Sequence, residues 1–234
     1  MNAPMQSVPD PPWWEVPARG KPRSGLTREA IVSAAVEVLD EAGIEGLSMR
    51  RVAEHLGTGA ASLYWHVADK EQLIHLLLDR VMGEIELPEP DATRWREQIR
   101  EYAMAGRAMF RRHRDIALAS LGRVPIGPNL IRMGEWLLAV LRGAGVPDRP
   151  AAWFADLIAL VGAAQALEDG MASANGDQVM AGMEQYMAML PPDQFPNLIE
   201  VASDMASGSP DDRFEFSLEL LLRGIETFID KPSD

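Results

Sequence analysis

Residues 26–81 have the sequence LTREAIVSAAVEVLDEAGIEGLSMRRVAEHLGTGAASLYWHVADKEQLIHLLLDRV, and this stretch decides the fold. Thr27 has the side chain of a helix N-cap. Apolar residues then recur at the spacing of one helical face: Ile31, Ala34, Ala35, Val38, Leu39 and Ala42. Gly43 is placed to end this helix. We therefore expect a first helix between Thr27 and Gly43, with one face buried.

Two short helices are expected next. Ser48 is placed to cap the first of them, whose apolar face has four residues: Met49, Val52, Ala53 and Leu56. A turn with Gly57 and Gly59 separates it from a helix over about residues 60–66. Two short helices joined by a glycine turn and flanked by longer ones form a helix-turn-helix, whose second short helix can lie in a DNA major groove.

A fourth helix leads out of this unit. Asp69 and Gln72 have the spacing of a capping box at its start, and Pro88 and Pro90 close it. More helices are expected beyond, over about residues 91–113, 115–122, 128–142, 148–173, 176–190, 194–206 and 210–229. No stretch alternates in the manner of a β-strand, so the sequence predicts an all-α protein.

The chain divides into an arm and two folded parts. Residues 1–25 are rich in proline and lack a helical apolar period, so we expect a flexible arm. Its basic end either solubilises the chain or follows DNA phosphates, and no role is evident for Trp13 and Trp14. Residues 26–72 form the head and residues 73–230 the body. Two body segments, AAWFADLIALVGAAQA and the one from Phe214 to Ile229, are apolar on broad faces, which is typical of a subunit interface.

Composition restricts the chemistry that the protein can perform. The 234 residues carry a net charge of −13, which divides by region as −2 over residues 1–18, −1 over 19–72 and −10 over 73–234. The absence of cysteine excludes disulfides, thiolate metal sites and cysteine nucleophiles. No glycine-rich phosphate loop, Ser/His/acid set or paired-histidine spacing stands out, so we do not expect an enzyme. No run of about 18 uncharged apolar residues is present, so we expect a cytoplasmic protein without a membrane span.

The third helix has a surface suited to DNA. Leu63 and Val67 lie one turn apart and are expected to pack inward. The residues then turned outward or to the flank are Ser62, Tyr64, Trp65 and His66. Arg50 and Arg51 fall in the first turn of the second helix, where a side chain can reach a phosphate or a guanine edge. Judged on the residues alone, a second interpretation stays open: the aromatic residues belong to a core and the arginines to an ordinary surface.

The motif LYWHV, followed by Asp-Lys-Glu, resembles the DNA-binding domain of the tetracycline-repressor (TetR) family, and the resemblance is strong over about residues 26–82. The body is similar to the C-terminal domain of the tetracycline repressors at HRDIALASLGRVP, LEDG and FEFSLELLLRGIETFI. The resemblance implies a homodimer on a palindromic operator, contacted by Ser48, Arg50, Ser62, Tyr64, Trp65, His66 and Lys70. Ala60 and Ala61 replace larger residues of the tetracycline repressors, although an alanine methyl can still contact thymine.

The resemblance also implies an effector pocket in the body. In the tetracycline repressors a His, an Arg and a Glu serve a magnesium–drug chelate, and the similar positions here are Ser120, Val124 and Glu168. Only the glutamate is kept, so we expect no metal site and no cofactor. The expected pocket residues are Glu86, Ser120, Val124, Met133, Trp136 and Glu168. Trp136 makes the pocket more apolar, and we expect a bulky, largely hydrophobic effector.

The implied mechanism has two states. An effector in the body shifts the linking helix, which changes the spacing of the two reading helices and lowers operator affinity. Two alternatives remain: an all-helical small-molecule-binding protein with weak or no DNA binding, and an activator in place of a repressor. His55, His75 and His113 are scattered along the chain, and we expect them to be surface or packing residues.

Overall fold

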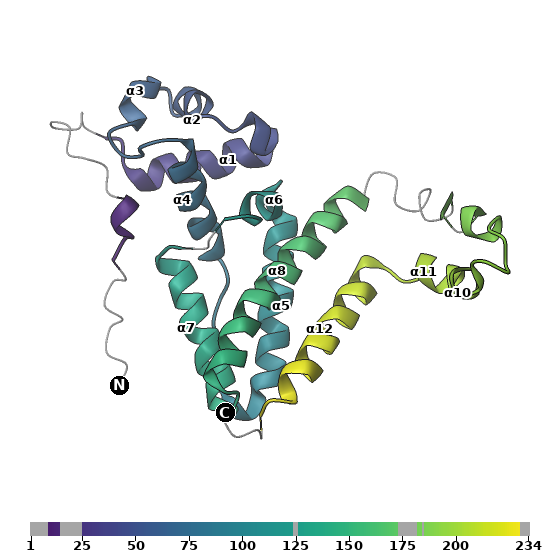
Figure 1. The fold of residues 1–234 in the computed structure, drawn as a ribbon. Helices are drawn as coiled ribbons and strands as arrows, with labels where there is room; N and C mark the ends of the chain where they lie inside the picture. The colour runs from purple at the N-terminus through teal and green to yellow at the C-terminus, as the bar shows by residue number, and fades with distance from the viewer. Residues whose placement is uncertain (1–8, 15–24, 124–125, 173–181, 184, 230–234) are drawn as a thin grey trace.

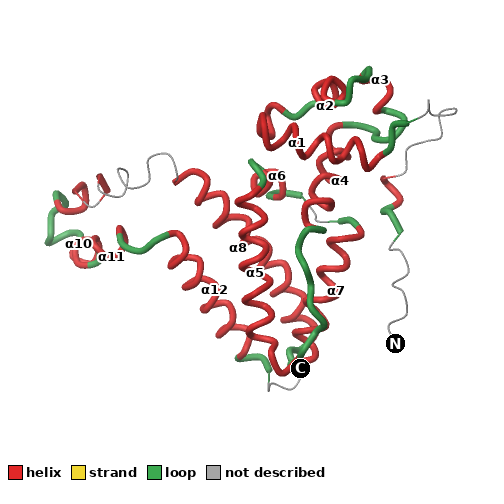
Figure 2. Tube along the Cα trace, turned by 180° about the vertical axis from the view of Figure 1, so that it is seen from behind, coloured by secondary structure: helices red, strands yellow, loops and turns green. Residues whose placement is uncertain are grey.

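The computed structural model describes residues 9–14, 25–123, 126–172, 182–183 and 185–229, and within these residues every regular element is a helix. A small head lies at one end, and helix α4 leads from it into a larger helical body (Figure 1). Seen from behind, the elements of head and body are helices joined by loops (Figure 2). The predicted all-α architecture, with a linking helix between a head and a body, is therefore confirmed.

The head begins with α1 (Arg28–Gly46). Thr27 caps this helix, because its hydroxyl accepts a hydrogen bond from the N–H of Ala30 at 3.1 Å. Gly43 adopts a φ of 71°, a left-handed conformation that interrupts the helix where the sequence predicted its end. One residue of α1 also meets the body at this point, since any side chain at Gly43 would collide with the carboxylate of Asp115.

The helix-turn-helix consists of α2 (Met49–His55) and α3 (Ala60–Leu63). The hydroxyl of Ser48 accepts from the N–H of Arg51 at 3.2 Å, which is the predicted cap. Gly57, with a φ of 65°, forms the turn. Helix α3 is shorter than predicted, because residues 64–66 continue as a turn in which Trp65 and His66 donate to carbonyls three residues back.

Helix α4 (Lys70–Met82) is capped by Asp69, whose carboxylate accepts from the N–H of Gln72 at 2.8 Å. The predicted capping box is only half formed. The side chain of Gln72 accepts from the N–H of Ala68 and donates to the carbonyl of Trp14 at 2.8 Å. Gln72 therefore joins the start of α4 to a residue far away in the sequence.

The expectation of a flexible arm over residues 1–25 is wrong for its described part. Residues 12–14 form a short 3₁₀ helix, η1 (Pro12–Trp14), and Trp14 is buried in the core of the head. Its carbonyl accepts from Gln72 and also from Arg28 at 3.3 Å. Arg28 is paired with Asp10 as well. Residues 15–24, which include the basic end of the arm, lie outside the described residues.

The body contains the remaining helices: η2 (Ala92–Arg94), α5 (Trp95–Arg112), α6 (Ile116–Ser120), α7 (Pro128–Gly143), α8 (Asp148–Ala172), α10 (Pro196–Glu200), α11 (Ala202–Ala206) and α12 (Pro210–Glu226). Helix α8 packs on α5, α7 and α12 around a core that includes Leu137, Leu141, Leu218 and Leu222. The helix predicted over 194–206 is divided in two at Val201, and of the one predicted over 176–190 the structure describes residues 182–183 and 185–190, of which 182–183 and 185–188 are helical.

Helices α8 and α12 each leave one apolar face exposed. The exposed side chains are Trp153, Leu157 and Leu160 on α8, and Phe216 and Leu220 on α12. The segment Asp148–Gly170 has the length and mean hydropathy, 1.4, of a helix that could cross a membrane. Asp156 interrupts it, so it contains no uncharged run of membrane length. Its other face is packed on four helices of the body, α5, α6, α7 and α12.

Candidate nucleic-acid interface and ligand cavity

The outer surface of α3 is set by two buried residues. Leu63 and Val67 are fully buried in the core of the head, as predicted. The side chains of Tyr64 and Trp65, between them, remain 41% and 42% exposed. Ser62 and His66 are half-buried, Ala61 is exposed and Ala60 is half-buried. An exposed pair of large aromatic residues on a rigidly anchored turn is suited to contact with a partner surface.

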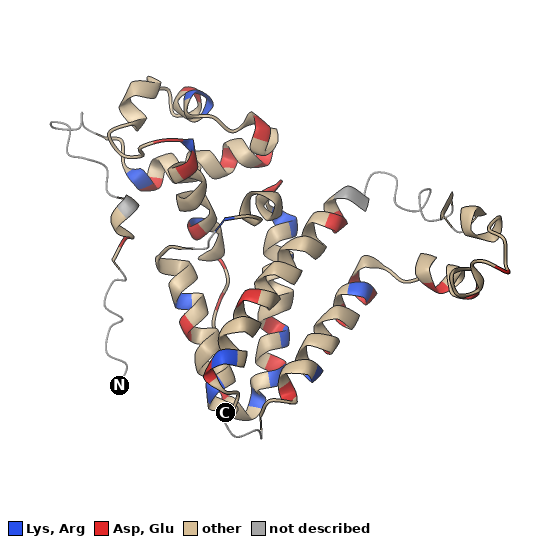
Figure 3. Cartoon of the chain, in the orientation of Figure 1, with Lys and Arg blue, Asp and Glu red and all other residues tan. Residues whose placement is uncertain are grey.

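The charged residues around this surface are few. Helix α3 has no charged residue and is coloured tan in Figure 3. Arg50 is highly exposed and pairs with Glu54 at 2.8 Å, one turn along α2. Lys70 lies at the start of α4 and donates to the carbonyl of Ile44 at 3.2 Å. Ser48 uses its oxygen as an acceptor in the cap, so its hydroxyl hydrogen stays available to a phosphate.

Several polar contacts join the head and α4 to the body, and two of them involve buried groups, at Asp79 and at His113. In the first of these contacts, the buried carboxylate of Asp79 in α4 accepts hydrogen bonds from the backbone N–H groups of Asn129 and Leu130, at 2.9 and 3.0 Å. These N–H groups belong to the first turn of α7, which Asp79 therefore caps from another helix. Burial raises the pKa of Asp79 above its ordinary value, although the hydrogen bonds from Leu130 and Asn129 oppose this.

The second contact connects α1 to the segment between α5 and α6. Asp40 of α1 accepts from the backbone N–H of Arg114 at 3.0 Å and lies 2.9 Å from Nδ1 of His113. The other ring nitrogen of His113 lies 3.3 Å from Glu84. Asp115 accepts from the N–H of Ile44 at 3.0 Å. His113 is therefore a buried, hydrogen-bonded residue at the junction of head and body.

A cavity of about 580 Å³ lies in the body. Met82, the last residue of α4, and Ile85 line one part of it. The remaining lining residues belong to α5, α6, α7, α8 and the loop after α6, and most of them are apolar. Its polar and charged lining residues are Tyr102, Arg107, Ser120, Arg123 and Asp156. Burial raises the pKa of Tyr102 to about 12, so its hydroxyl stays protonated near neutral pH. The volume is within the range of pockets for small molecules.

The cavity includes only part of the pocket predicted from the sequence. Ser120 and Met133 line it, whereas Glu86 and Glu168 are exposed and outside its lining. Trp136 is buried behind the wall: its ring centroid is 5.4 Å from that of Tyr102, and its Nε1 donates to the carbonyl of Pro88 at 2.6 Å. Val124 lies outside the described residues. Tyr102, Arg107 and Arg123 were not predicted, because no local pattern distinguishes them from surface residues of amphipathic helices and turns.

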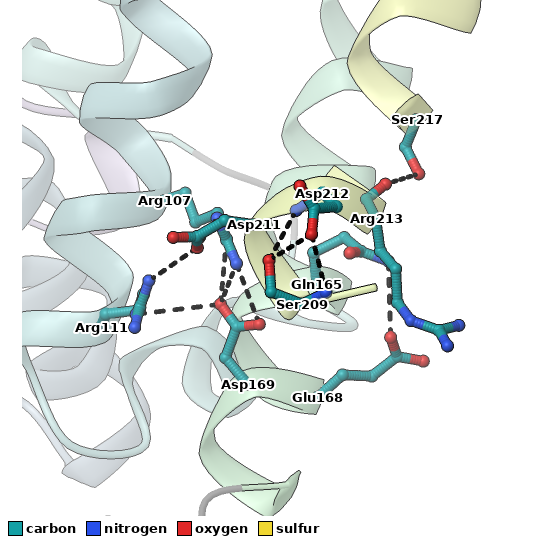
Figure 4. Close-up of polar contacts among 10 residues, drawn as sticks. All are labelled: Arg107, Arg111, Gln165, Glu168, Asp169, Ser209, Asp211, Asp212, Arg213 and Ser217. Atoms are coloured by element: carbon teal, nitrogen blue, oxygen red, sulfur yellow. Dashed lines mark hydrogen bonds and ion pairs between the residues drawn. The ribbon is translucent and has the colours of Figure 1, made fainter. Parts of the chain in front are cut away.

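Arg107 is a buried cation that lines the cavity, and Figure 4 shows its polar contacts. Its guanidinium donates to Asp169 of α8 at 2.9 and 3.1 Å and to Asp211 of α12 at 2.8 Å. It also lies 4.7 Å from the ring of Phe214. Arg107 and Asp169 are only 3% and 8% exposed, so this cluster ties α5, α8 and α12 together inside the body.

Among the described residues, no group of three or more His, Asp and Glu side chains could hold a metal ion.

The site consists of an anchored aromatic surface in the head, an apolar cavity in the body, and a helix, α4, that reaches both. This arrangement defines a helix-turn-helix DNA-binding protein with a separate small-molecule cavity.

Comparison with known families identifies the class more closely. Residues 31–77 match the family described as bacterial regulatory proteins, tetR family, and residues 87–229 match the tetracyclin repressor-like C-terminal domain. The chain belongs to the TetR family of transcriptional regulators. The resemblance stated from the LYWHV motif is thereby confirmed.

Individual relatives cover most of the chain. It is 32% identical over 222 residues to the HTH-type transcriptional repressor DrrR1 of Streptomyces coeruleorubidus, covering 91% of this chain and 82% of that protein. An HTH-type transcriptional regulator of Saccharopolyspora erythraea is 36% identical over 140 residues, a match spanning 60% of this chain and 59% of that relative. The crystal structure of apo ActR from Streptomyces coelicolor superposes with a TM-score of 0.82 at 39% identity, covering 89% of this chain and all of that one. ActR in complex with actinorhodin gives 0.84 at 37% identity, covering 90% and 100%.

Proposed function

We propose that this regulator is a repressor that occupies a palindromic operator and leaves it when a small, largely hydrophobic effector fills the cavity of the body. One observation carries the proposal: α4 begins beside the exposed aromatic surface of the head and ends at Met82 in the cavity wall. From Lys70 to Met82, α4 rises about 18 Å along its axis. A change in the cavity that displaces Met82 therefore acts on the same rigid element that carries Lys70.

The proposed operator contacts come from the head, residues 26–72. They are Ser48, Arg50, Ala60, Ala61, Ser62, Tyr64, Trp65, His66 and Lys70. The exposure of Tyr64, Trp65 and Arg50 supports this set. Arg50 can exchange Glu54 for a phosphate, because both side chains are exposed and such a pair adds little stability. The repressor name of DrrR1 also supports the assignment, and the protein would act in the cytoplasm.

The body, residues 73–230, would bind the effector and a second copy of the chain. The cavity is largely apolar, and the similar fold of ActR holds actinorhodin. The exposed apolar faces of α8 and α12 can form a four-helix interface with those of the partner. A homodimer built in this way would place two reading helices about 34 Å apart on one face of DNA.

DNase footprinting on the DNA upstream of the protein's own gene tests the proposal. A repressor of this kind protects a palindrome, and protection requires two chains for each operator. Absence of any protection at low salt would leave only the alternative, a small-molecule-binding protein without a DNA function.

Sedimentation of Trp153→Asp tests the proposed interface. A charge in the middle of the apolar face of α8 should convert the dimer to a monomer at micromolar concentration. Leu118→Asp, at an exposed apolar residue of α6, is the matched control and should remain dimeric. A wild-type monomer, or a dimer that persists in Trp153→Asp, would contradict this interface.

A further inference from the structure

Arg123 links the wall of the cavity to the first turn of α4. It follows α6 and lines the cavity together with its neighbours Leu121 and Gly122. Its guanidinium donates from Nε and Nη2 to the two carboxylate oxygens of Glu71, at 2.7 and 3.1 Å. Nη1 donates to the carbonyl of Ala119 at 2.7 Å. One side chain thus ties the end of α6, the cavity and the head.

Glu71 lies at a sensitive position. It is the residue after Lys70, which is among the proposed operator contacts, and it belongs to the first turn of α4. The hydrogen bond from Arg123 is the largest cause that lowers the pKa of Glu71, so the carboxylate is ionised when the pair is formed. Among the described residues that line the cavity, Arg123 alone forms an ion pair with a residue of the head.

The cavity has two arginines, and only one of them can change partner at low cost. If Arg107 moved toward a ligand, Asp169, which is only 8% exposed, would lose both of its short hydrogen bonds from Arg107 and keep only the long contact with Arg111, at 3.9 Å, which is strongly unfavourable. Glu71 is different, because its side chain is 57% exposed and water solvates it when Arg123 leaves. A guanidinium in the wall of an apolar cavity, held by an exchangeable partner, matches a carboxylate in two parallel hydrogen bonds.

We infer that the effector is a bulky apolar molecule with a carboxylate, and that this group binds Arg123 in exchange for Glu71. The exchange releases the first turn of α4 from the loop after α6 and weakens the hold on the head. The inference rests on the proposed function, since it assigns the chemistry of the effector and the first step of its action. Arg123 is thereby the residue that recognises the acid group.

Calorimetry on the full-length, DNA-free protein tests the inference with two pairs of probes: 2-naphthoate against 2-naphthamide, and anthraquinone-2-carboxylate against its carboxamide. The two members of each pair have the same rings, and an anionic carboxylate in one is replaced by a neutral amide in the other. The wild type should bind the carboxylate at least about tenfold more tightly than the amide. In Arg123→Gln this preference should fall below about twofold, and Arg123→Lys should keep part of it.

Glu71→Gln gives a result that a purely structural role of Arg123 would not produce. Removal of the competing carboxylate should raise the affinity for both acids by about two- to fivefold and leave the amides unchanged. Arg142→Gln, which breaks an exposed ion pair with Asp148 at the far end of α7, is the control and should match the wild type. Circular dichroism spectra establish that each variant is folded.

The inference is overturned if acids and amides bind equally, if neither pair binds, or if the preference survives in Arg123→Gln. Operator binding by the ligand-free wild type, measured in parallel, tests the proposed function separately. If the protein binds its operator but does not prefer the acids, only the inference about Arg123 is wrong. A protein that prefers the acids but binds no DNA contradicts the proposed function and leaves the recognition by Arg123 standing.

Discussion

The head and the body use aromatic side chains in opposite ways. In the head, Tyr64 and Trp65 stay exposed because Leu63 and Val67 on either side of them are fully buried. In the body, Tyr102 and Trp136 turn inward with their ring centroids 5.4 Å apart, Tyr102 in the wall of a cavity and Trp136 buried behind it. The head thus presents a surface set by a few consecutive residues, whereas the body encloses a volume between helices.

The largest effect is expected in the core of the head. Leu63→Ala removes a fully buried side chain and should lower the free energy of unfolding by about 2–5 kcal/mol. Urea titration followed by circular dichroism measures it. Leu118→Ala, at an exposed leucine of α6, should change stability by less than about 0.5 kcal/mol. Equal losses in the two variants would mean that Leu63 does not anchor the reading surface.

Trp14 tests whether residues outside the helix-turn-helix belong to the head. Trp14→Ala should lower stability by about 2 kcal/mol, the value of burying a large apolar side chain. Its Nε1 has no hydrogen-bond partner among the described residues, so Trp14→Phe should retain most of the stability. Thermal unfolding of the two variants checks this. A Trp14→Ala variant as stable as the wild type would show that the segment does not dock.

Asp79 tests the junction of α4 and α7 through its pH dependence. Its pKa in the folded protein is raised above the ordinary 3.8, mainly by burial, so the folded state holds its proton more tightly than the unfolded state. Its contribution to stability is therefore full below pH 3.8 and is lost as the pH rises through the raised value. Asp79→Asn cannot titrate at this position. The wild type should thus gain stability relative to Asp79→Asn as the pH falls toward 3.8, in urea titrations at several pH values. A difference between the two proteins that does not vary with pH would contradict the assignment.

The smallest effect is expected at Arg50. Arg50→Ala should weaken operator binding similarly for all sequences and reduce the slope of log affinity against log salt by about 1, as for one lost phosphate contact. Stability should not change, because the pair with Glu54 is exposed. Fluorescence anisotropy at several salt concentrations measures the slope. The control is Arg142→Ala, and a slope in Arg50→Ala that equals the control would remove Arg50 from the contact set.

Sequence reasoning was accurate where the structure is local. Thr27, Ser48 and Asp69 cap the helices they were expected to cap, because a cap depends on hydrogen bonds to residues three positions away. Leu63 and Val67 pack inward because their spacing matches one helical turn. The family assignment rested on the same short stretch.

Sequence reasoning failed where interacting residues are distant in the sequence. Gln72 was expected to complete a local capping box, but its amide donates to Trp14, 58 residues earlier. Arg123 and Glu71 are 52 residues apart, and no periodicity connects a loop after α6 with the start of α4. The cavity depends on how five helices pack, so position-by-position resemblance placed Ser120 in its wall together with Glu168, which is exposed and outside it.

The central claim is that the exposed aromatic surface of the head reads DNA, and Trp65→Ala tests it most directly. Fluorescence anisotropy with the footprinted operator should show a loss of affinity of about tenfold or more, the size expected for one lost specific contact. The thermal unfolding of the variant should match the wild type, because Trp65 is exposed. A Trp65→Ala protein that binds the operator as tightly as the wild type would contradict the account.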